Sequence, residues 1–213
     1  MDKFSIVIPT LWKSTRIYKL INDLIQCDNV DEIILIDNSN EYYKHFDFKP
    51  EKINLITPNS NMYVNPSWNY GVEISKNSFV ALLNDDINFD VSIFNFFNFY
   101  KLDRYGIIGM DSTNYSTEKN EPKIIKENRT KGKYLPQRYG WGCMIIFDKK
   151  YWLNIPDNIK IWFGDDFIRN LNKSPISYLT DFKIETDMST TSDEPIWNEQ
   201  KQIDNLNFVK LFR

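Results

Sequence analysis

Two pairs of neighbouring aspartates have the residue type and the position that suit catalysis. Asp85 and Asp86 come directly after the apolar run 79–83, and Asn84 precedes them. Two carboxylates in a tight turn after a buried strand form a hard-oxygen site that suits Mg²⁺ or Mn²⁺, and an ion bound there would stabilise a departing diphosphate. The structural alternative is that this acidic pair only turns the chain after the strand.

Asp165 and Asp166 form the second pair, and they follow Trp162 and Phe163 at the start of a helical pattern. One interpretation is structural, because the helix dipole stabilises carboxylates at a helix N-terminus. The other is catalytic, because a carboxyl group among aromatic residues can have a raised pKa and accept a proton. His45, the only histidine, lies in a polar segment and does not indicate a catalytic triad.

The elements that must position these residues alternate between strand and helix patterns. Strands are expected at 4–8, 32–37, 53–56, 79–83, 107–110 and 142–147. Helical patterns begin at residues 14–15 and at 90, and others cover 66–75, 149–153 and 162–171. Alternation at this spacing predicts βαβ units and therefore an α/β fold with a mostly parallel sheet.

Polar residues stand directly after three of the expected strands. Pro9 and Thr10 follow the first strand, Asp37 and Asn38 follow the second, and the Asn84–Asp86 turn follows the fourth. In an open α/β sheet, ligands bind beyond the carboxyl ends of the strands. These residues are therefore expected to line one common binding site.

No glycine-rich phosphate-binding loop accompanies these strand ends, since neither GxGxxG nor GxxxxGK[ST] occurs. A bound diphosphate must then be neutralised by a metal ion or by other charges. Segment 111–139 has little periodicity and carries a local excess of basic residues, which are Lys123, Lys126, Arg129, Lys131, Lys133 and Arg138. It is expected to be either a solvated loop or a mobile basic lid over a phosphate-bearing ligand.

Composition limits the class of protein. The 213 residues are 42% hydrophobic, which is enough for one core, so a single domain over 1–213 is expected. A net charge of −3 gives no electrostatic basis for a dedicated nucleic-acid binder. No apolar run approaches the ~18–20 residues that a transmembrane helix needs, and no secretory signal precedes the first strand. Cys27 and Cys143 are too few for a disulfide framework. A cytoplasmic protein is expected, either complete or as one domain of a larger chain.

Taken in order, the segments resemble the family-2-type glycosyltransferases with the GT-A fold. The matching segments are 4–10, 32–39, 61–71, 82–87, 140–144 and 162–166, so the resemblance covers about residues 4–170. It implies a GT-A-type three-layer αβα sandwich, with a nucleotide-sugar-binding half at 1–110 and a smaller acceptor-side half at 111–213. The small size and the Asn-rich composition also resemble glycosyltransferase domains of large DNA viruses, which would place the protein in the host cytoplasm.

The resemblance also implies a role for each matching residue. Asp37 would accept the N3 proton of uracil or thymine, Asp86 would ligate Mn²⁺ or Mg²⁺, and Asp85 would touch the ribose or the metal. Asp166, with Asp165 as close contender, would deprotonate the acceptor hydroxyl. The other expected nucleotide-sugar contacts are Pro9, Thr10, Asn38, Asn61, Asn65 and Asn84, and the expected sugar platforms, for which burial in the core is the alternative, are Trp141 and Trp162.

Two positions depart from the family pattern. Trp68 stands where the family often has Arg, and no histidine follows Asp166 to help bind a metal. The metal would then rely on Asp86, the diphosphate and water.

The function implied is that of a metal-dependent, inverting hexosyl- or deoxyhexosyltransferase. It would move a sugar from a nucleoside-diphosphate sugar, with a UDP-sugar favoured, to a hydroxyl of a glycan acceptor. One alternative is a nucleotidyltransferase that makes sugar nucleotides, which would be expected to carry a glycine-rich basic loop where this chain has Pro9–Trp12. The other alternative is a non-catalytic module that binds nucleotide sugars or glycans on the same scaffold.

Overall fold

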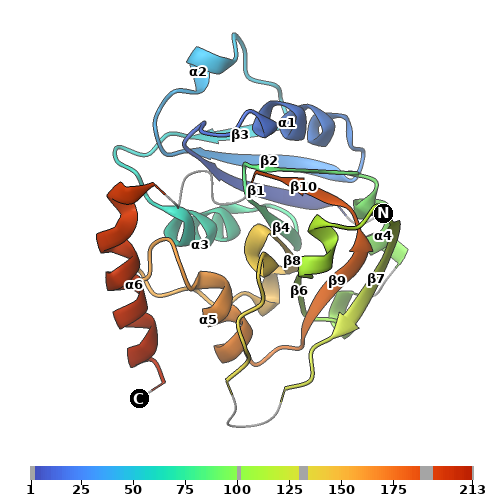
Figure 1. The fold of residues 1–213 in the computed structure, drawn as a ribbon. Helices are drawn as coiled ribbons and strands as arrows, with labels where there is room; N and C mark the ends of the chain where they lie inside the picture. Colours follow the sequence, from blue (N-terminus) through green and yellow to red (C-terminus); the bar gives the residue numbers. More distant parts are fainter. Residues whose placement is uncertain (1–2, 100–101, 130–133, 188–193, 213) are drawn as a thin grey trace.

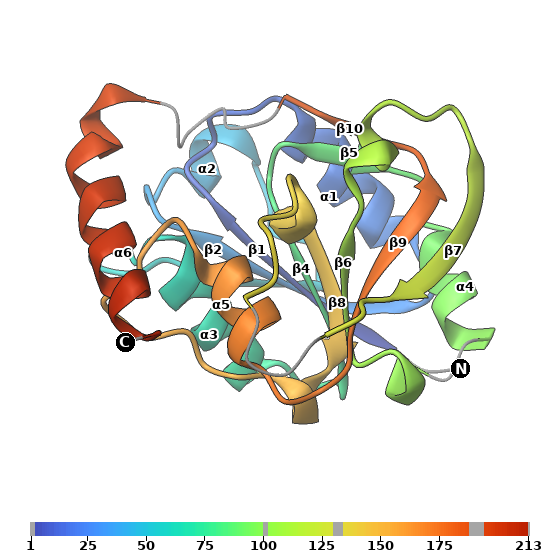
Figure 2. The same ribbon diagram turned by 60° about the horizontal axis from the view of Figure 1, so that its bottom comes forward.

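The computed structural model describes residues 3–99, 102–129, 134–187 and 194–212. These residues form one eight-stranded sheet in the order β3-β2-β1-β4-β8-β6-β9-β7. Its strands are β1 (Phe4–Thr10), β2 (Val30–Asp37), β3 (Ile53–Ile56), β4 (Phe79–Leu83), β6 (Ile107–Met110), β7 (Asn120–Lys126), β8 (Met144–Asp148) and β9 (Ile176–Phe182). Figure 1 shows this sheet at the centre of the molecule. A separate antiparallel ribbon joins β5 (Ile87–Phe89) to β10 (Ile184–Thr186), and both strands are labelled in Figure 2.

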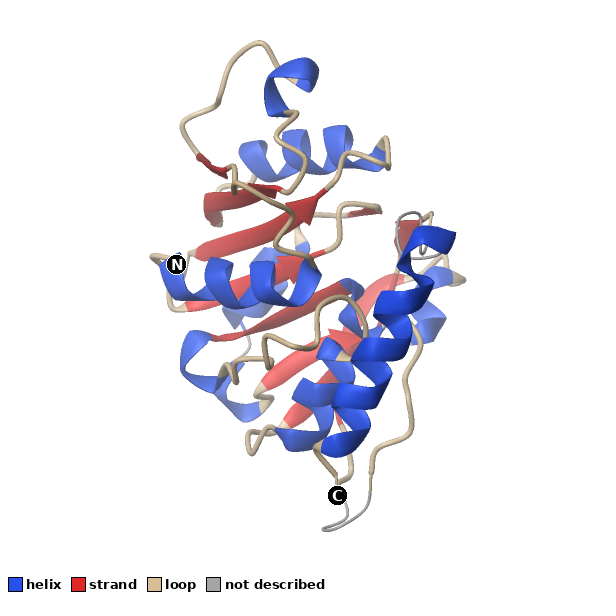
Figure 3. Cartoon of the chain, turned by 90° about the vertical axis from the view of Figure 1, so that its left-hand side faces the viewer, coloured by secondary structure: helices blue, strands red, loops and turns tan. Residues whose placement is uncertain are grey.

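Successive side chains of the central strands point to opposite faces of the sheet and build two cores. In β1, Phe4, Ile6 and Ile8 belong to one core and Val7 belongs to the other. The first core is covered by α1 (Arg16–Gln26) and α4 (Ile93–Phe99). The second is covered by α3 (Val64–Ile74), α5 (Gly164–Leu171) and α6 (Asn198–Lys210). Helices therefore lie on both sides of the sheet, as in the expected three-layer sandwich (Figure 3).

The parallel half of the sheet brings the expected polar residues to one edge. Strands β3, β2, β1 and β4 are parallel to one another, and Thr10 at the end of β1 is in register with Asp37 at the end of β2. Helix α3 packs closely on β1 at Gly71, where a Cβ atom would lie 2.3 Å from a methyl carbon of Val7. A glycine is needed there because any side chain would push the helix away from the sheet.

The second half of the chain differs from the sequence expectation in several elements. Strand β8 is antiparallel to β4 and β6, and segment 111–139 contains β7, which pairs antiparallel with β9. The expectation that this whole segment is a loop is therefore wrong. Strand β7 is an edge strand with mostly exposed side chains, so it lacks the apolar run that marks a buried strand. Strands β5, β9 and β10 and helix α6 were also not predicted.

The basic residues of segment 111–139 mostly bind the protein itself. The Nζ atom of Lys123 lies 2.9 Å from Asp181 Oδ2, and Arg129 donates to the backbone carbonyls of Asn170 and Asn172. These two side chains therefore do not support the alternative in which the segment forms a basic lid over a ligand. Lys131 and Lys133 lie outside the described residues.

None of the helices in the described ranges combines the length and the apolar character that crossing a membrane requires. Helix α6, which the sequence did not predict, lies beside α5 at one side of the molecule (Figure 2).

Candidate active site

A cavity of about 490 Å³ opens beyond the carboxyl ends of β1 and β4. It brings together nine of the residues that the sequence singled out, which are Pro9, Thr10, Asn38, Asn61, Asn84, Asp85, Asp86, Trp162 and Asp165. Four others do not line it, which are Asp37, Asn65, Trp141 and Asp166. The two acidic turns, which are about 80 positions apart in the sequence, therefore face one space.

Thr10 connects the end of β1 to the first acidic turn. Its Oγ1 donates a hydrogen bond of 2.6 Å to Asp85 Oδ2 and accepts one of 2.8 Å from the backbone N–H of Trp12. Trp12 has a φ of 58°, which is unusual for a residue other than glycine and marks a locally strained turn. Burial raises the pKa of Asp85 to about 6, the bond from Thr10 opposes this rise, and the neighbouring charge of Asp86 adds to it.

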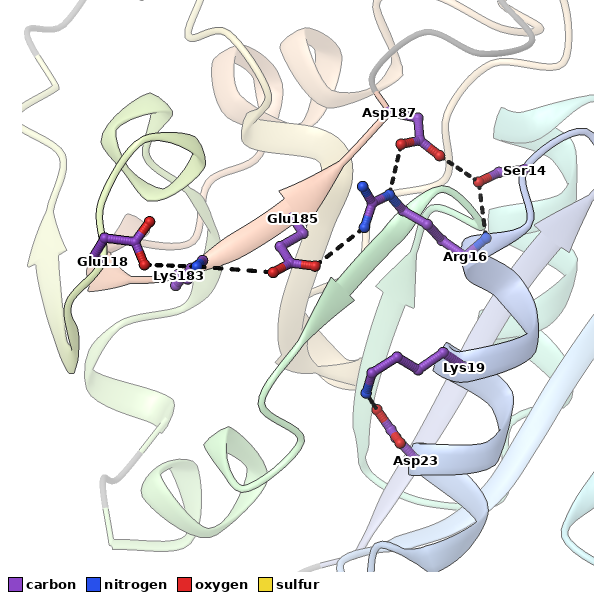
Figure 4. A network of polar contacts seen from close by, with 8 residues as sticks. All are labelled: Ser14, Arg16, Lys19, Asp23, Glu118, Lys183, Glu185 and Asp187. Carbon is purple, nitrogen blue, oxygen red and sulfur yellow. Dashed lines mark hydrogen bonds and ion pairs between the residues drawn. The ribbon is translucent and has the colours of Figure 1, made fainter.

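The backbone of Asp86 is held by Asp187, the residue directly after β10. The N–H of Asp187 donates to the carbonyl of Asp86 at 3.2 Å. Arg16 in turn binds Asp187 at 2.8 Å and Glu185 at 3.3 Å, and Ser14 donates to Asp187 at 3.0 Å (Figure 4). Arg16 lowers the pKa of Asp187, chiefly through this hydrogen bond. Exposed ion pairs of this kind contribute about 0–1 kcal/mol each, so their main effect here is to fix the position of the turn.

Asp85 and Asp86 are the residues that fit a divalent ion. Both residues line the cavity, and besides burial the charge of Asp86 contributes to the raised pKa of Asp85. No cluster of three or more His, Cys, Asp or Glu suited to a metal occurs in the described part of the chain. Mg²⁺ is commonly held by one or two carboxylates together with water and substrate phosphates, so two carboxylates are sufficient for such an ion. Burial raises the pKa of Asp85, and a cation beside it would offset that cost.

The second acidic turn is positioned by Asn65 of α3. This side chain is fully buried, and its Nδ2 donates to the carbonyls of Ile159 at 3.0 Å and Trp162 at 3.3 Å. A Cβ atom at Gly164 would lie 2.1 Å from Asn65 Oδ1, so only glycine allows α5 to begin there. Asn65 was expected to contact the nucleotide sugar, but in this structure it does not line the cavity and instead holds the loop that carries the acidic pair.

The two aspartates of α5 point in different directions. Asp165 is half-buried and lines the cavity, next to Gly142, where a Cβ atom would lie 2.9 Å from that of Asp165. Asp166 is buried, and its Oδ1 lies 3.6 Å from Nη1 of Arg169. Burial raises the pKa of Asp165. Burial, together with the charge of Asp165, raises the pKa of Asp166 to about 7. The cavity is thus accessible to Asp165 and not to Asp166, the residue favoured by the sequence.

Arg169 belongs to a buried network that stabilises this side of the cavity. Its Nη2 lies 2.7 Å from Glu127 Oε1, and its Nη1 donates to the carbonyl of Pro136 at 3.0 Å. Arg138 binds Glu127 and Asp111, and its guanidinium lies 3.8 Å from the centre of the Tyr178 ring. These contacts tie the chain before Gly140 to α5. Arg138 is thereby paired within the protein, whereas the basic-lid hypothesis assigned its charge to a ligand.

Asp37 and Trp141 also bind within the protein and do not line the cavity. Asp37 is fully buried, and it accepts from Trp12 Nε1 at 2.9 Å and from the backbone N–H of Tyr42 at 2.7 Å, so it shapes the turn after β2 rather than facing a base. Trp141 is also fully buried. Its ring packs against Gly109, and its Nε1 donates to the carbonyl of Ser177 at 3.2 Å. The structure thus agrees with the alternative that the sequence left open for Trp141, burial in the core.

Helix α6 and Trp197, the residue directly before it, contribute side chains that the sequence did not indicate. Trp197 and Lys201 line the cavity, and Nζ of Lys201 lies 5.5 Å from the centre of the Trp162 ring. Asp204 is fully buried and binds the loop before α5. Few residues of 198–210 are apolar, so the helical spacing gave no signal for this element.

Comparison with known proteins bears on both the family and the fold. A family model described as "Glycosyl transferase family 2" matches residues 5–161. No curated protein sequence matches the chain. Structures of S. aureus TarS resemble it at low identity. Residues 1–349 of TarS give a TM-score of 0.57 at 15% identity, over 97% of this chain and 70% of that one. A longer TarS structure gives 0.58 at 16%, over 97% of this chain and 43% of that one.

TarS 1–349 in complex with UDP-GlcNAc gives a TM-score of 0.58 at 14% identity, over 97% of this chain and 71% of that one. Together these likenesses confirm the expected α/β fold class. The family match ends at residue 161, so it does not include the acidic pair of α5 or any part of α6.

Proposed function

The chain belongs to glycosyl transferase family 2 and is a glycosyltransferase, and we propose that it is metal-dependent, inverting and specific for a UDP-sugar donor and a glycan hydroxyl. One observation carries this proposal. The cavity has a pair of carboxylates suited to a metal at the end of β4 and a separate carboxylate, Asp165, at the start of α5. Leaving-group stabilisation and proton removal need two such distinct sites.

The donor is proposed to lie along the carboxyl ends of β1 and β4. Pro9, Thr10 and Asn84 offer contacts for the nucleoside and its phosphates, and Asn61 lines the same cavity. Asn38 shapes this edge, because its Oδ1 accepts from the N–H of Met62 at 2.8 Å. The TarS complexes contain UDP-GlcNAc and UDP, which makes uridine nucleotides the first to test for this chain.

Asp85 and Asp86 would hold Mn²⁺ or Mg²⁺. When bound, such an ion supplies positive charge that stabilises the leaving diphosphate. Thr10 donates to Asp85 Oδ2 and thereby fixes the orientation of that carboxylate. Lys201 is the one lysine or arginine that lines the cavity within the described ranges, and its Nζ stands over the ring of Trp162.

Asp165 is proposed as the general base. Its carboxylate takes the proton of the acceptor hydroxyl while that oxygen forms a bond to the anomeric carbon of the donor sugar. The bond from this carbon to the diphosphate oxygen breaks, and the nucleoside diphosphate leaves with the bonding electrons. Attack from the face opposite to the diphosphate inverts the anomeric configuration. Burial raises the pKa of Asp165, which makes its carboxylate a better proton acceptor than an ordinary aspartate.

The release of UDP from a UDP-sugar, measured with Mn²⁺ as a function of pH, tests this function. A base works only as the carboxylate, so kcat/KM is expected to fall about tenfold per pH unit below the pKa of the aspartate pair. Because burial raises both pKa values in this pair, this fall should begin at a higher pH than it would for an ordinary aspartate, whose pKa is 3.8. Asp166→Asn removes the neighbouring negative charge, so it should move the fall to lower pH.

Three outcomes would contradict the proposal. The first is a pH profile that stays flat down to pH 4. The second is release of diphosphate from UTP and a sugar phosphate without any release of UDP, since this would indicate the nucleotidyltransferase instead. The third is binding of UDP-sugars without any turnover, which would support a non-catalytic module.

A further inference from the structure

Helix α6 contacts the backbone that leads into the second acidic turn. Asp204 lies in the middle of this helix and is fully buried. Its Oδ1 accepts from the N–H of Lys160 at 3.0 Å, and its Oδ2 accepts from the N–H of Ile161 at 2.8 Å and of Trp162 at 3.1 Å. Three successive backbone donors therefore converge on one carboxylate that is more than 40 positions away in the sequence.

A carboxylate is the group that this arrangement requires. Residues 159–163 belong to neither a helix nor a strand, so their N–H groups have no partners from regular secondary structure. An ionised aspartate offers two oxygens that only accept, and hydrogen bonds to it are stronger than those between neutral groups. An asparagine would offer one accepting oxygen and would turn an NH₂ group towards at least one of the three donors.

The same loop is held at further points. The carbonyl of Trp162 accepts from Asn65 of α3, so the backbone at this residue is bound on both sides. The ring of Phe163, a residue with φ of 62°, stacks on Phe208 of α6 with centroids 5.1 Å apart. Asp165 follows Phe163 by two residues. The carboxylate of Asp165 therefore keeps a fixed position only if the backbone of residues 162–165 keeps one conformation.

We propose that Asp204 is a positioning residue for Asp165. By holding three N–H groups of the loop, Asp204 keeps the unusual backbone at Phe163 and aims Asp165 into the cavity. This inference rests on the proposed function of Asp165, and it adds α6, which lies outside the family match, to the machinery of the enzyme. A displacement of the base by about 1 Å can cost about 10²-fold in rate.

The test compares the wild-type chain with Asp204→Asn, Asp204→Glu and the control Leu24→Ala. Leu24 is a buried residue of α1 on the other face of the sheet, so this control removes core packing away from the cavity. Three quantities are measured for each: amide hydrogen exchange at residues 160–162, kcat for UDP release from a UDP-sugar, and Kd for UDP with Mn²⁺.

Asp204→Asn is expected to raise exchange at these amides at least about tenfold and to lower kcat by about 10²-fold, with Kd for UDP unchanged. Asp204→Glu keeps the charge and should retain part of the protection and of the rate. Leu24→Ala should leave all three quantities unchanged. Unchanged exchange in Asp204→Asn, unchanged kcat, or an equal loss of kcat in Leu24→Ala would overturn the inference. A wild-type chain that releases no UDP would contradict the proposed function, whereas the exchange data would still decide whether Asp204 holds the loop.

Discussion

Asp165→Asn is expected to lower kcat for sugar transfer by about 10²–10⁴-fold, because an amide cannot take the proton of the acceptor hydroxyl. The side chain keeps its size, so the cavity and the loop before α5 should keep their shape. Kd for UDP with Mn²⁺ should stay close to the wild-type value, because Asp165 belongs to α5 and is not one of the two carboxylates that would hold the ion. Steady-state kinetics and a calorimetric titration with UDP measure the two quantities.

Asp166→Asn is the matched control for this prediction. Asp166 is buried against Arg169 and does not line the cavity, so its replacement should affect stability more than the chemical step. A residual kcat within about tenfold of the wild type is expected. If Asp166→Asn is inactive and Asp165→Asn is active, the base is Asp166, as the family resemblance implies, and the orientation argument is wrong.

Asp86→Asn is expected to abolish the activation of transfer by Mn²⁺ and to lower kcat/KM by about 10²–10³-fold at a fixed concentration of metal. The amide keeps one oxygen but loses the negative charge that would hold a divalent ion beside a diphosphate. Activity is measured against Mn²⁺ concentration. Asp23→Asn is the control, because Asp23 lies on α1 with its carboxylate paired to Lys19 at 2.5 Å, outside the cavity.

An equal response to Mn²⁺ in Asp86→Asn and in the wild type would contradict the assignment of the ion to this turn. A wild-type enzyme that is fully active in the presence of a strong chelator would contradict metal dependence itself.

The parallel half of the fold was accessible from the sequence for a physical reason. Strands β1, β2 and β4 are buried on both faces, so they appear as continuous apolar runs such as Ile33–Ile36. The second half gives a weaker signal. Edge strand β7 exposes most of its side chains, and α6 contacts the rest of the protein through only a few buried residues, such as Asp204 and Phe208. Such elements are fixed by tertiary contacts rather than by a local pattern.

The candidate site shows the same limit at the level of single side chains. Because Thr10, Asn84 and Asp85 lie at or directly after the ends of strands of the parallel sheet, the sequence correctly predicted that they line one cavity. The direction of a side chain depends on local geometry that the spacing does not give. Asp37 is turned inward by the donors of its own loop, and Asp165 and Asp166 are about 100° apart around α5, so only one of them faces the cavity.

The central claim is that the cavity binds a nucleoside diphosphate with a divalent ion at the end of β4. Thermal unfolding of the wild-type chain with UDP-, GDP- and dTDP-sugars, each with and without Mn²⁺, tests it most directly. A ligand at about 100 times its Kd adds about 2.7 kcal/mol to the free energy of unfolding. For a chain of this size, that corresponds to a rise in Tm of about 5–10 °C. We expect this rise for the UDP-sugar with Mn²⁺ and a much smaller one without Mn²⁺. No rise with any of the three donors in the presence of Mn²⁺ would contradict the claim.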